Sequence, residues 1–240
     1  MLVENKFIYL NLPRCASTSF HITCMRKKLD IKYYDTVLHR LNDEIDLTLS
    51  NEDIADQLSH THEKIVDLKR KFGSDIPVIA VRRDKYDRYL SLWKHIIDEL
   101  HRVGEMEVYE IFKNLTTDEL LSYTSQDIVS NEMKYEAIKS FLKRVGSPKH
   151  GPYVTAMIYM QMSPTSHYHN HDPNIIWFDI KNLEDLENWV SNKLGQEFRL
   201  ERVNSSQHFE CNIEIDDYFK QKYDGVYDIY DSPKTSKTLL

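Results

Sequence analysis

The stretch FIYLNLPRCASTSF, residues 7–20, decides the fold. Its apolar, β-branched and aromatic start predicts a buried strand, and Pro13 and Arg14 end that run. Small and hydroxyl side chains follow, and a helical pattern resumes at Phe20. A strand that turns through small residues into a helix presents main-chain N–H groups and the positive end of the helix dipole. The stretch therefore predicts an anion-binding turn, although a serine-capped strand-to-helix turn is the simpler interpretation.

Side chains in this turn favour the anion hypothesis. Arg14 offers a forked positive group suited to phosphate or sulfate, and three hydroxyls add donors. The candidate anion-binding residues are Arg14, Cys15, Ala16, Ser17, Thr18 and Ser19.

Composition limits the classes of protein that the chain fits. Its 240 residues are 41% hydrophobic, enough for one sizeable core, and we expect a single domain over residues 1–240. A net charge of −7 argues against a basic nucleic-acid-binding surface.

Three cysteines, a low and odd number, favour a reducing compartment. A strand close to Met1 leaves no room for a signal peptide, and no apolar run approaches the roughly 20 residues of a membrane span. We expect a soluble, cytoplasmic protein with neither nucleic-acid nor membrane partners.

Apolar runs and helical periodicities alternate along the chain. Strands are expected at residues 7–10, 77–81 and 174–178, with a fourth possible at 197–203. Helices are expected at residues 20–29, 51–72, 84–103, 183–194 and 213–230, with more over 105–146. Strands separated by helices predict an α/β fold with a central, mostly parallel sheet flanked by helices. Ligands of such sheets bind at the carboxyl ends of the strands.

A second informative stretch is VIAVRRDKYDRYLSLWKH, residues 78–95. Its strand leads into Arg82 and Arg83, and Ser91 follows two helical turns later. Arg83 is therefore expected at the same sheet edge as the first turn, where an arginine and a hydroxyl would hold a second anionic group. The simpler interpretation is a solvated helix start with an incidental serine.

Together the two stretches resemble the PAPS-dependent sulfotransferases, which use 3′-phosphoadenosine 5′-phosphosulfate (PAPS) as donor. Pro13 to Phe20 is similar to their 5′-phosphosulfate loop, nearest to that of the heparan sulfate 2-O-sulfotransferases. Arg82 to Trp93 is similar to their 3′-phosphate motif, with Arg83 and Ser91 in the binding positions. Residues 178–195 and the C-terminal segment resemble carbohydrate sulfotransferases more loosely, and residues 96–172 match nothing in the family.

The resemblance implies a P-loop-like three-layer fold and transfer of the PAPS sulfuryl group to a hydroxyl, without a metal. The 2-O-like loop favours a saccharide acceptor. Two residues depart from the nearest pattern, because Arg14 stands where those relatives carry lysine and Cys15 where they carry threonine or serine. Arg14 is expected to stabilise the negative charge that grows on the departing phosphate oxygen.

The acceptor hydroxyl must lose a proton, which calls for a base that titrates near neutrality. His60 and His62 match a His-x-His pair that supplies the base in the 2-O-sulfotransferases. A helix would direct them to nearly opposite faces, with His62 beside the apolar stripe, whereas an extended segment would direct both to one side. His62 is the preferred base, and His60 and His95 are the alternatives.

Other patterns point to different chemistry. His167, His169 and His171 alternate and would share one face of a strand as metal ligands, but a polar loop explains them equally well, and we expect no metal. Cys15 lacks the arginine six residues later that a phosphatase loop requires. The run IIWFD mimics a Walker-B strand, but the first loop lacks GxxxxGK. A P-loop nucleotide-dependent kinase and a non-catalytic nucleotide-binding protein of the same fold remain as alternatives.

Overall fold

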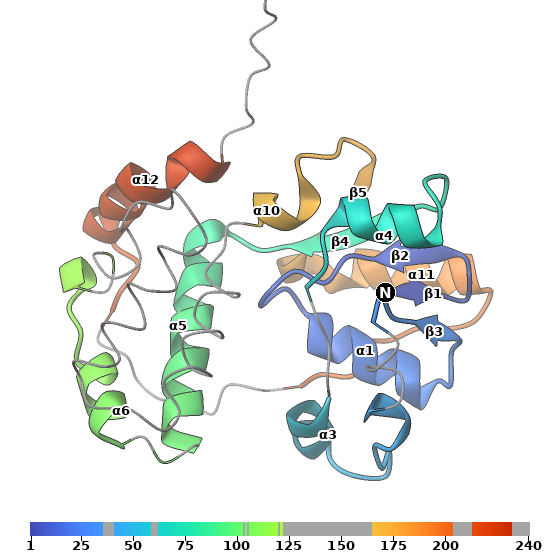
Figure 1. The fold of residues 1–240 in the computed structure, drawn as a ribbon, viewed down its shortest axis with the longest axis horizontal. Coiled ribbons are helices and arrows are strands. Elements are labelled where there is room, and N and C mark those ends of the chain that lie inside the picture. The colour runs from blue at the N-terminus through green and yellow to red at the C-terminus, as the bar shows by residue number, and fades with distance from the viewer. Residues whose placement is uncertain are drawn as a thin grey trace, which may run out of the picture. The chain divides into compact units, whose positions relative to one another are not determined.

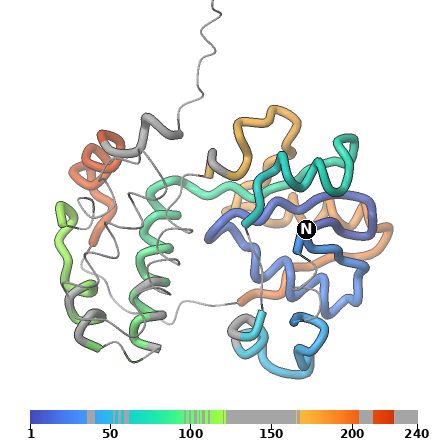
Figure 2. Tube along the Cα trace, viewed as in Figure 1, coloured from blue at the N-terminus to red at the C-terminus, as the bar shows by residue number. Residues whose placement is uncertain are grey.

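The computed structural model describes residues 1–35, 41–58, 62–102, 104, 106–119, 121, 165–203 and 213–231, drawn in colour in Figure 1, and Figure 2 follows the Cα trace in the same view. The chain divides into two compact units. The first combines Met1–Arg83 with Thr165–Ser205, and the second combines Asp84–Pro164 with Ser206–Leu240. A single domain over the whole chain stays a prediction.

The first unit is built on a five-stranded sheet (Figure 1). Its strands are β1 (Leu2–Val3), β2 (Phe7–Tyr9), β3 (Ile31–Lys32), β4 (Val78–Arg82) and β5 (Ile175–Asp179), in the order β3-β1-β2-β4-β5. The three expected strands are confirmed as β2, β4 and β5, which lie side by side and pair in parallel. Their predicted burial is confirmed for β2 and β4, whereas the edge strand β5 is only partly buried.

The expectation of a mostly parallel sheet is wrong, because β1 pairs antiparallel with both β2 and β3. Glu4 and Asn5 adopt left-handed backbone angles in the tight turn between β1 and β2. A connection this short can join only antiparallel neighbours. The fold is therefore α/β with a mixed sheet, in which the parallel half carries the two informative stretches.

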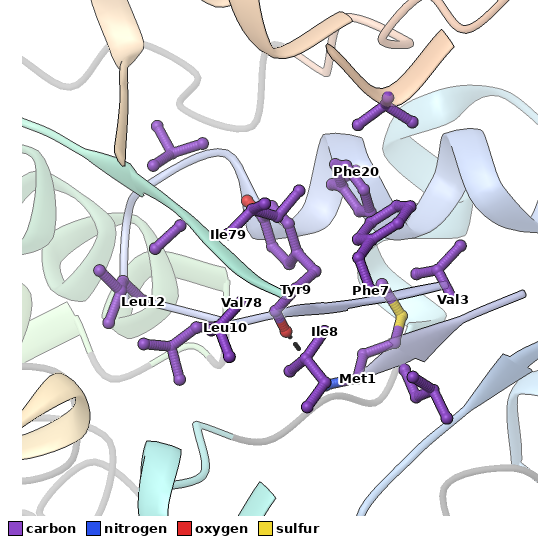
Figure 3. Packing of buried hydrophobic residues seen from close by; sticks show 14 of the residues in the cluster. Met1, Val3, Phe7, Ile8, Tyr9, Leu10, Leu12, Phe20, Val78 and Ile79 are labelled. Carbon is purple, nitrogen blue, oxygen red and sulfur yellow. Dashed lines mark hydrogen bonds between the residues drawn. The ribbon is translucent and has the colours of Figure 1, made fainter. Parts of the chain in front are cut away.

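Aromatic packing fixes β2 against the helix that follows it. Phe7 and Tyr9 are fully buried and point to the same face, where Figure 3 shows Phe20 above them. The rings of Tyr9 and Phe20 stack at 3.9 Å, and Phe7 meets Trp189 edge-on at 5.3 Å. Helices α1 (Ser17–Arg26) and α11 (Leu183–Leu194) therefore pack on one face of the sheet.

Further helical elements of this unit include α3 (Asn51–Gln57), α4 (Ile65–Phe72), α10 (Ser166–His169) and the 3₁₀ turn η1 (Ile180–Asn182). The single helix expected over residues 51–72 is wrong, because α3 and α4 are separate. Leu58 has left the helical region, with ψ of 120°, and Lys64 is extended, with ψ of 144°. Residues 59–61 lie outside the described residues.

The fourth strand expected at residues 197–203 is also wrong, since that segment is irregular. Its apolar pattern serves a different purpose, because Phe198 is fully buried and contacts Phe20 at 5.2 Å between ring centroids. The N–H of Glu201 donates to the Thr23 hydroxyl at 2.8 Å instead of to a neighbouring strand.

The described part of the second unit is helical, with α5 (Lys85–Arg102), α6 (Met106–Lys113) and α12 (Asp217–Asp231). Trp93 of α5 stacks on Phe112 of α6 at 5.0 Å, and Tyr89 of α5 packs against Phe219 of α12 at 5.8 Å. The other helices expected over 105–146 lie outside the described residues. Among the helices that are described, none has the length and apolar character to cross a membrane.

Candidate anion-binding and base site

The turn after β2 has the strand–turn–helix form that the sequence predicts. Arg14 and Ala16 have φ of 61° and 62°, in the left-handed region that favours glycine. Ala16 is the N-cap of α1, and the first intrahelical bond runs from the Phe20 N–H to the Ala16 carbonyl at 3.0 Å. The N–H groups of residues 17–19 come before that bond and so have no helical carbonyl to meet. They form the helix N-terminus at the end of a parallel strand.

Two of the candidate side chains shape this turn from within. The buried Ser17 hydroxyl donates to the Leu12 carbonyl at 3.0 Å, and the Cys15 thiol contacts the Pro13 carbonyl at 3.5 Å. Cys15 is only 1% exposed, and its carbonyl accepts a bond from the Tyr9 hydroxyl at 3.1 Å. A threonine or serine hydroxyl at position 15 would therefore point into the core.

The outer side of the turn is formed by Arg14, Ala16, Thr18 and Ser19, which are all half-buried. These residues and the first-turn amides are the groups within reach of a ligand that approaches from solvent. Hydroxyl donors, amide donors and a guanidinium suit an anion with several oxygens.

Arg83 reaches this turn from the neighbouring strand. It follows β4, whose parallel pairing with β2 puts both carboxyl ends at one sheet edge. Its Nη1 donates to the Arg14 carbonyl at 3.5 Å. The adjacent Arg82 side chain is 65% exposed, and its Nε lies 3.8 Å from Oδ2 of Asp179 on β5. The structure therefore brings Arg83, rather than Arg82, to the turn.

The other half of the second stretch belongs to the second unit. Ser91 and His95 are both half-buried on α5, two turns and three turns into that helix. The pairing of Ser91 with Arg83 on one phosphate stays a prediction, as does the alternative of His95 as base.

His62 lies beside the same turn. It is half-buried, and its Nδ1 is 3.0 Å from the main-chain carbonyl of Asn11, two residues before Pro13. The Tyr168 ring packs edge-on against it at 5.9 Å. His62 precedes α4 in non-helical backbone, which excludes the helical alternative at this residue. His60 lies outside the described residues.

The Asn11 carbonyl also determines which nitrogen of His62 is basic. A carbonyl oxygen only accepts, so Nδ1 carries the hydrogen and the lone pair of the neutral ring is on Nε2. A neutral imidazole held in this way is equipped to take a proton at Nε2.

Sequence reasoning missed the residues behind His62. Asn11 and His21 are 2% and 0% exposed, and the Nε2 of His21 lies 3.0 Å from Oδ1 of Asn11. A weak signal was present, since Asn11 interrupts an apolar run and His21 sits on the buried side of a helix.

The alternating histidines do not form a strand, which removes the premise of the metal hypothesis. His169 ends α10, and His171 follows in a turn, where its N–H donates to Nδ1 of His169 at 3.0 Å. Burial and, to a smaller extent, the charge of His171 together lower the pKa of His169 from 6.5 to about 4. Within the described residues no group of three His, Cys, Asp or Glu side chains is placed to hold a metal.

Comparisons of the chain with protein-family models, with curated proteins and with solved structures gave no match.

Proposed function

We propose that the protein is a PAPS-dependent sulfotransferase of P-loop-like fold that transfers the sulfuryl group to a hydroxyl acceptor, favouring a saccharide. The observation that carries the proposal is the contact between Arg83 and the Arg14 carbonyl. It joins two segments whose sequences separately resemble the two phosphate-binding motifs of that family. If either segment resembled its motif only by chance, there would be no reason for the two segments to be in contact.

The two ends of the donor have distinct partners in this proposal. The first-turn amides of α1, Arg14, Thr18 and Ser19 take the 5′-phosphosulfate, because they lie on the outer side of the turn. Arg83 takes the 3′-phosphate, with Ser91 as the second contact that the resemblance implies. The overall charge of −7 makes this local gathering of positive groups more specific for an anion.

The transfer is an in-line displacement at sulfur. The acceptor oxygen forms a bond to sulfur while the bond from sulfur to the bridging phosphate oxygen breaks. The electron pair of the broken bond stays on the 5′-phosphate, where Arg14 and the helix N-terminus stabilise the added charge. Nε2 of His62 receives the acceptor proton, and the adjacent Asn11 carbonyl stabilises the imidazolium through Nδ1–H.

The cytoplasmic assignment is part of the same proposal. Cys24 is a free, buried thiol. Unpaired thiols are the usual state in a reducing compartment, where PAPS chemistry on soluble acceptors would then take place.

Thermal unfolding with nucleotides tests the donor. We expect adenosine 3′,5′-bisphosphate to raise the melting temperature more than ADP, or ATP with magnesium, because only the bisphosphate presents a 3′-phosphate to Arg83. Equal or greater stabilisation by ATP with magnesium would instead favour the kinase alternative. Binding of the bisphosphate without transfer to any of a broad panel of saccharide, phenol and alcohol acceptors would favour the non-catalytic alternative.

A further inference from the structure

Behind His62 lies a chain of buried polar side chains that the proposed donor site does not use. Asn11, His21 and Tyr33 are 2%, 0% and 4% exposed. They come from the segment after β2, from α1 and from the segment after β3. Buried polar groups destabilise a core unless they bond to one another, so an apolar residue at each position would be the simpler solution.

The bonds in this chain have a direction. Burial raises the pKa of the Tyr33 hydroxyl to about 12, so it keeps its proton at neutral pH and can donate. Its oxygen lies 3.4 Å from Nδ1 of His21, and Nε2 of His21 lies 3.0 Å from Oδ1 of Asn11. With Tyr33 donating to Nδ1, the His21 hydrogen is on Nε2 and is donated to the amide oxygen.

The chain ends at His62. The Asn11 side chain is held by His21, and the main-chain carbonyl of the same residue accepts from Nδ1 of His62 at 3.0 Å. A side chain clamped in the core restricts rotation of its own peptide unit, and so fixes the direction of that carbonyl. Hydrogen-bond partners one step behind a functional histidine commonly set its tautomer and ring orientation.

We propose that Asn11 and His21 are positioning residues that hold His62 in the tautomer with a basic Nε2. The inference rests on the proposed role of His62 as the base, but the tautomer itself is a property of the protein without ligands. Tyr33 supports the far end of the chain, and Tyr168 covers one side of the His62 ring.

The protein contains its own reference for this tautomer. His169 accepts a main-chain N–H at Nδ1, so its neutral ring must carry the hydrogen on Nε2, the reverse of His62. Ring ¹⁵N chemical shifts of the full-length protein near pH 7.5 distinguish the two forms. His62→Gln assigns the His62 signals by their loss, and the His169 signals are assigned in the same way. We expect opposite tautomers, and a His62 ring with its hydrogen on Nε2 would overturn the proposal.

A matched pair at His21 tests the positioning. His21→Phe keeps a buried ring and removes the donor, whereas His21→Gln retains an N–H donor of similar reach. We expect the Phe variant to give a mixture of His62 tautomers and the Gln variant to restore the wild-type form. A folded Phe variant with an unchanged tautomer would overturn the proposal. Asn11→Ala tests the same step from the other side, should His21→Phe fail to fold, and an unchanged tautomer there would likewise overturn it.

Activity adds a second, separable measurement. With an acceptor found by the panel above, His21→Phe should lower kcat about tenfold or more. The stabilisation by adenosine 3′,5′-bisphosphate should be unchanged, and His21→Gln should recover most of the rate. A kcat equal to that of the wild type in a variant with mixed tautomers would overturn the proposal. If no nucleotide binds while the tautomers respond as expected, the proposed function fails and the positioning of His62 still holds.

Discussion

Nη1 of Arg83 donates to the main-chain carbonyl of Arg14 at 3.5 Å, although the two residues are 69 positions apart in the chain. The contact follows from the parallel pairing of β2 and β4, which puts their carboxyl ends together. It brings a second guanidinium to the turn, from the residue that directly follows β4.

The first prediction concerns Arg83→Ala. The substitution removes a charge-assisted contact to the 3′-phosphate, a loss of about 1.5–3 kcal/mol in binding free energy. The affinity for adenosine 3′,5′-bisphosphate, measured by calorimetry, should therefore fall about tenfold or more. The fold should survive, because Arg83 leaves the sheet after the last residue of β4.

The neighbouring arginine provides the matched control. Arg82 carries the same charge, but its side chain is 65% exposed and pairs with Asp179. An exposed ion pair of this kind contributes little to stability. Arg82→Ala should leave bisphosphate affinity within about twofold of the wild type, as expected for a lost charge screened by solvent. Equal losses from the two substitutions would mean that net charge alone, rather than the position of Arg83, governs binding.

The second prediction concerns strain in the turn. Ala16 has φ of 62° and ψ of 15°, a left-handed conformation that costs a non-glycine residue about 1–2 kcal/mol. Glycine removes this strain but loses more entropy on folding, by about 0.4–1 kcal/mol. Ala16→Gly should thus raise the free energy of unfolding by up to about 1 kcal/mol in urea titrations. Ala16→Val should lower it by about 1–3 kcal/mol, because a β-branched residue tolerates this region poorly. Destabilisation by glycine would contradict the left-handed assignment.

The sequence predicted the strands best where a continuous apolar run was long enough to indicate both a strand and its place in the sheet. The interior strands β2 and β4 are buried apart from Arg82, and buried parallel strands read as continuous apolar runs. The edge strand β5 also has an apolar run, although Ile176 within it is exposed. The strands β1 and β3 have two residues each, too few to show a period of two. Because those two strands pair antiparallel, missing them made the sheet look more parallel than it is.

The break between α3 and α4 shows how a helical period can mislead. Ile54, Leu58, Ile65 and Leu68 keep one spacing across the break, yet they belong to two different cores. Ile54 and Leu58 pack in a small cluster with Ile22. Ile65 and Leu68 pack with the sheet strands. The helical period correctly indicates which residues are buried, but it does not show that they pack in the same core.

Some contacts of the candidate site could be predicted from the sequence, and others could not. The proximity of Arg14 and Arg83 could be predicted, because parallel strands determine which edge each arginine occupies. The contact between His62 and Asn11 could not, since its acceptor is a main-chain carbonyl, which every residue possesses. His21 and Tyr33 were missed for a related reason: their role depends on burial and on partners distant in sequence.

The third prediction concerns pH and His169. Burial, and then the charge of His171, lower its pKa from 6.5 to about 4. The unfolded chain therefore binds this proton more readily than the folded protein, so stability is fully present above pH 6.5 and is lost as the pH falls toward 4. His169→Phe keeps a ring against Trp177, which lies 5.1 Å away, and removes the titration.

Calorimetric melting at pH 7 and pH 5 checks this prediction. The free energy of unfolding of the wild type should fall by about 1 kcal/mol more than that of His169→Phe, a value discounted for the solvent screening of a partly exposed ring. His171→Gln serves as the exposed control and should follow the wild type, apart from the small relief of charge on His169. Parallel pH profiles for wild type and His169→Phe would show that His169 titrates normally in the folded state.

The last prediction is that His62 is the general base. Nδ1 is committed to the Asn11 carbonyl, so the ring presents Nε2 to the acceptor. His62→Ala removes the proton acceptor from the transfer step, and loss of such a base typically lowers the rate by about 10²–10⁴-fold. Donor binding should remain, because the base contacts the acceptor and not the nucleotide. The variant should therefore keep the stabilisation by adenosine 3′,5′-bisphosphate and lose most transfer activity.

His60→Ala provides the comparison, and it should lower the rate equally only if an extended segment directs both histidines to the same side. Near-normal turnover of His62→Ala would instead leave His60 or His95 as the base.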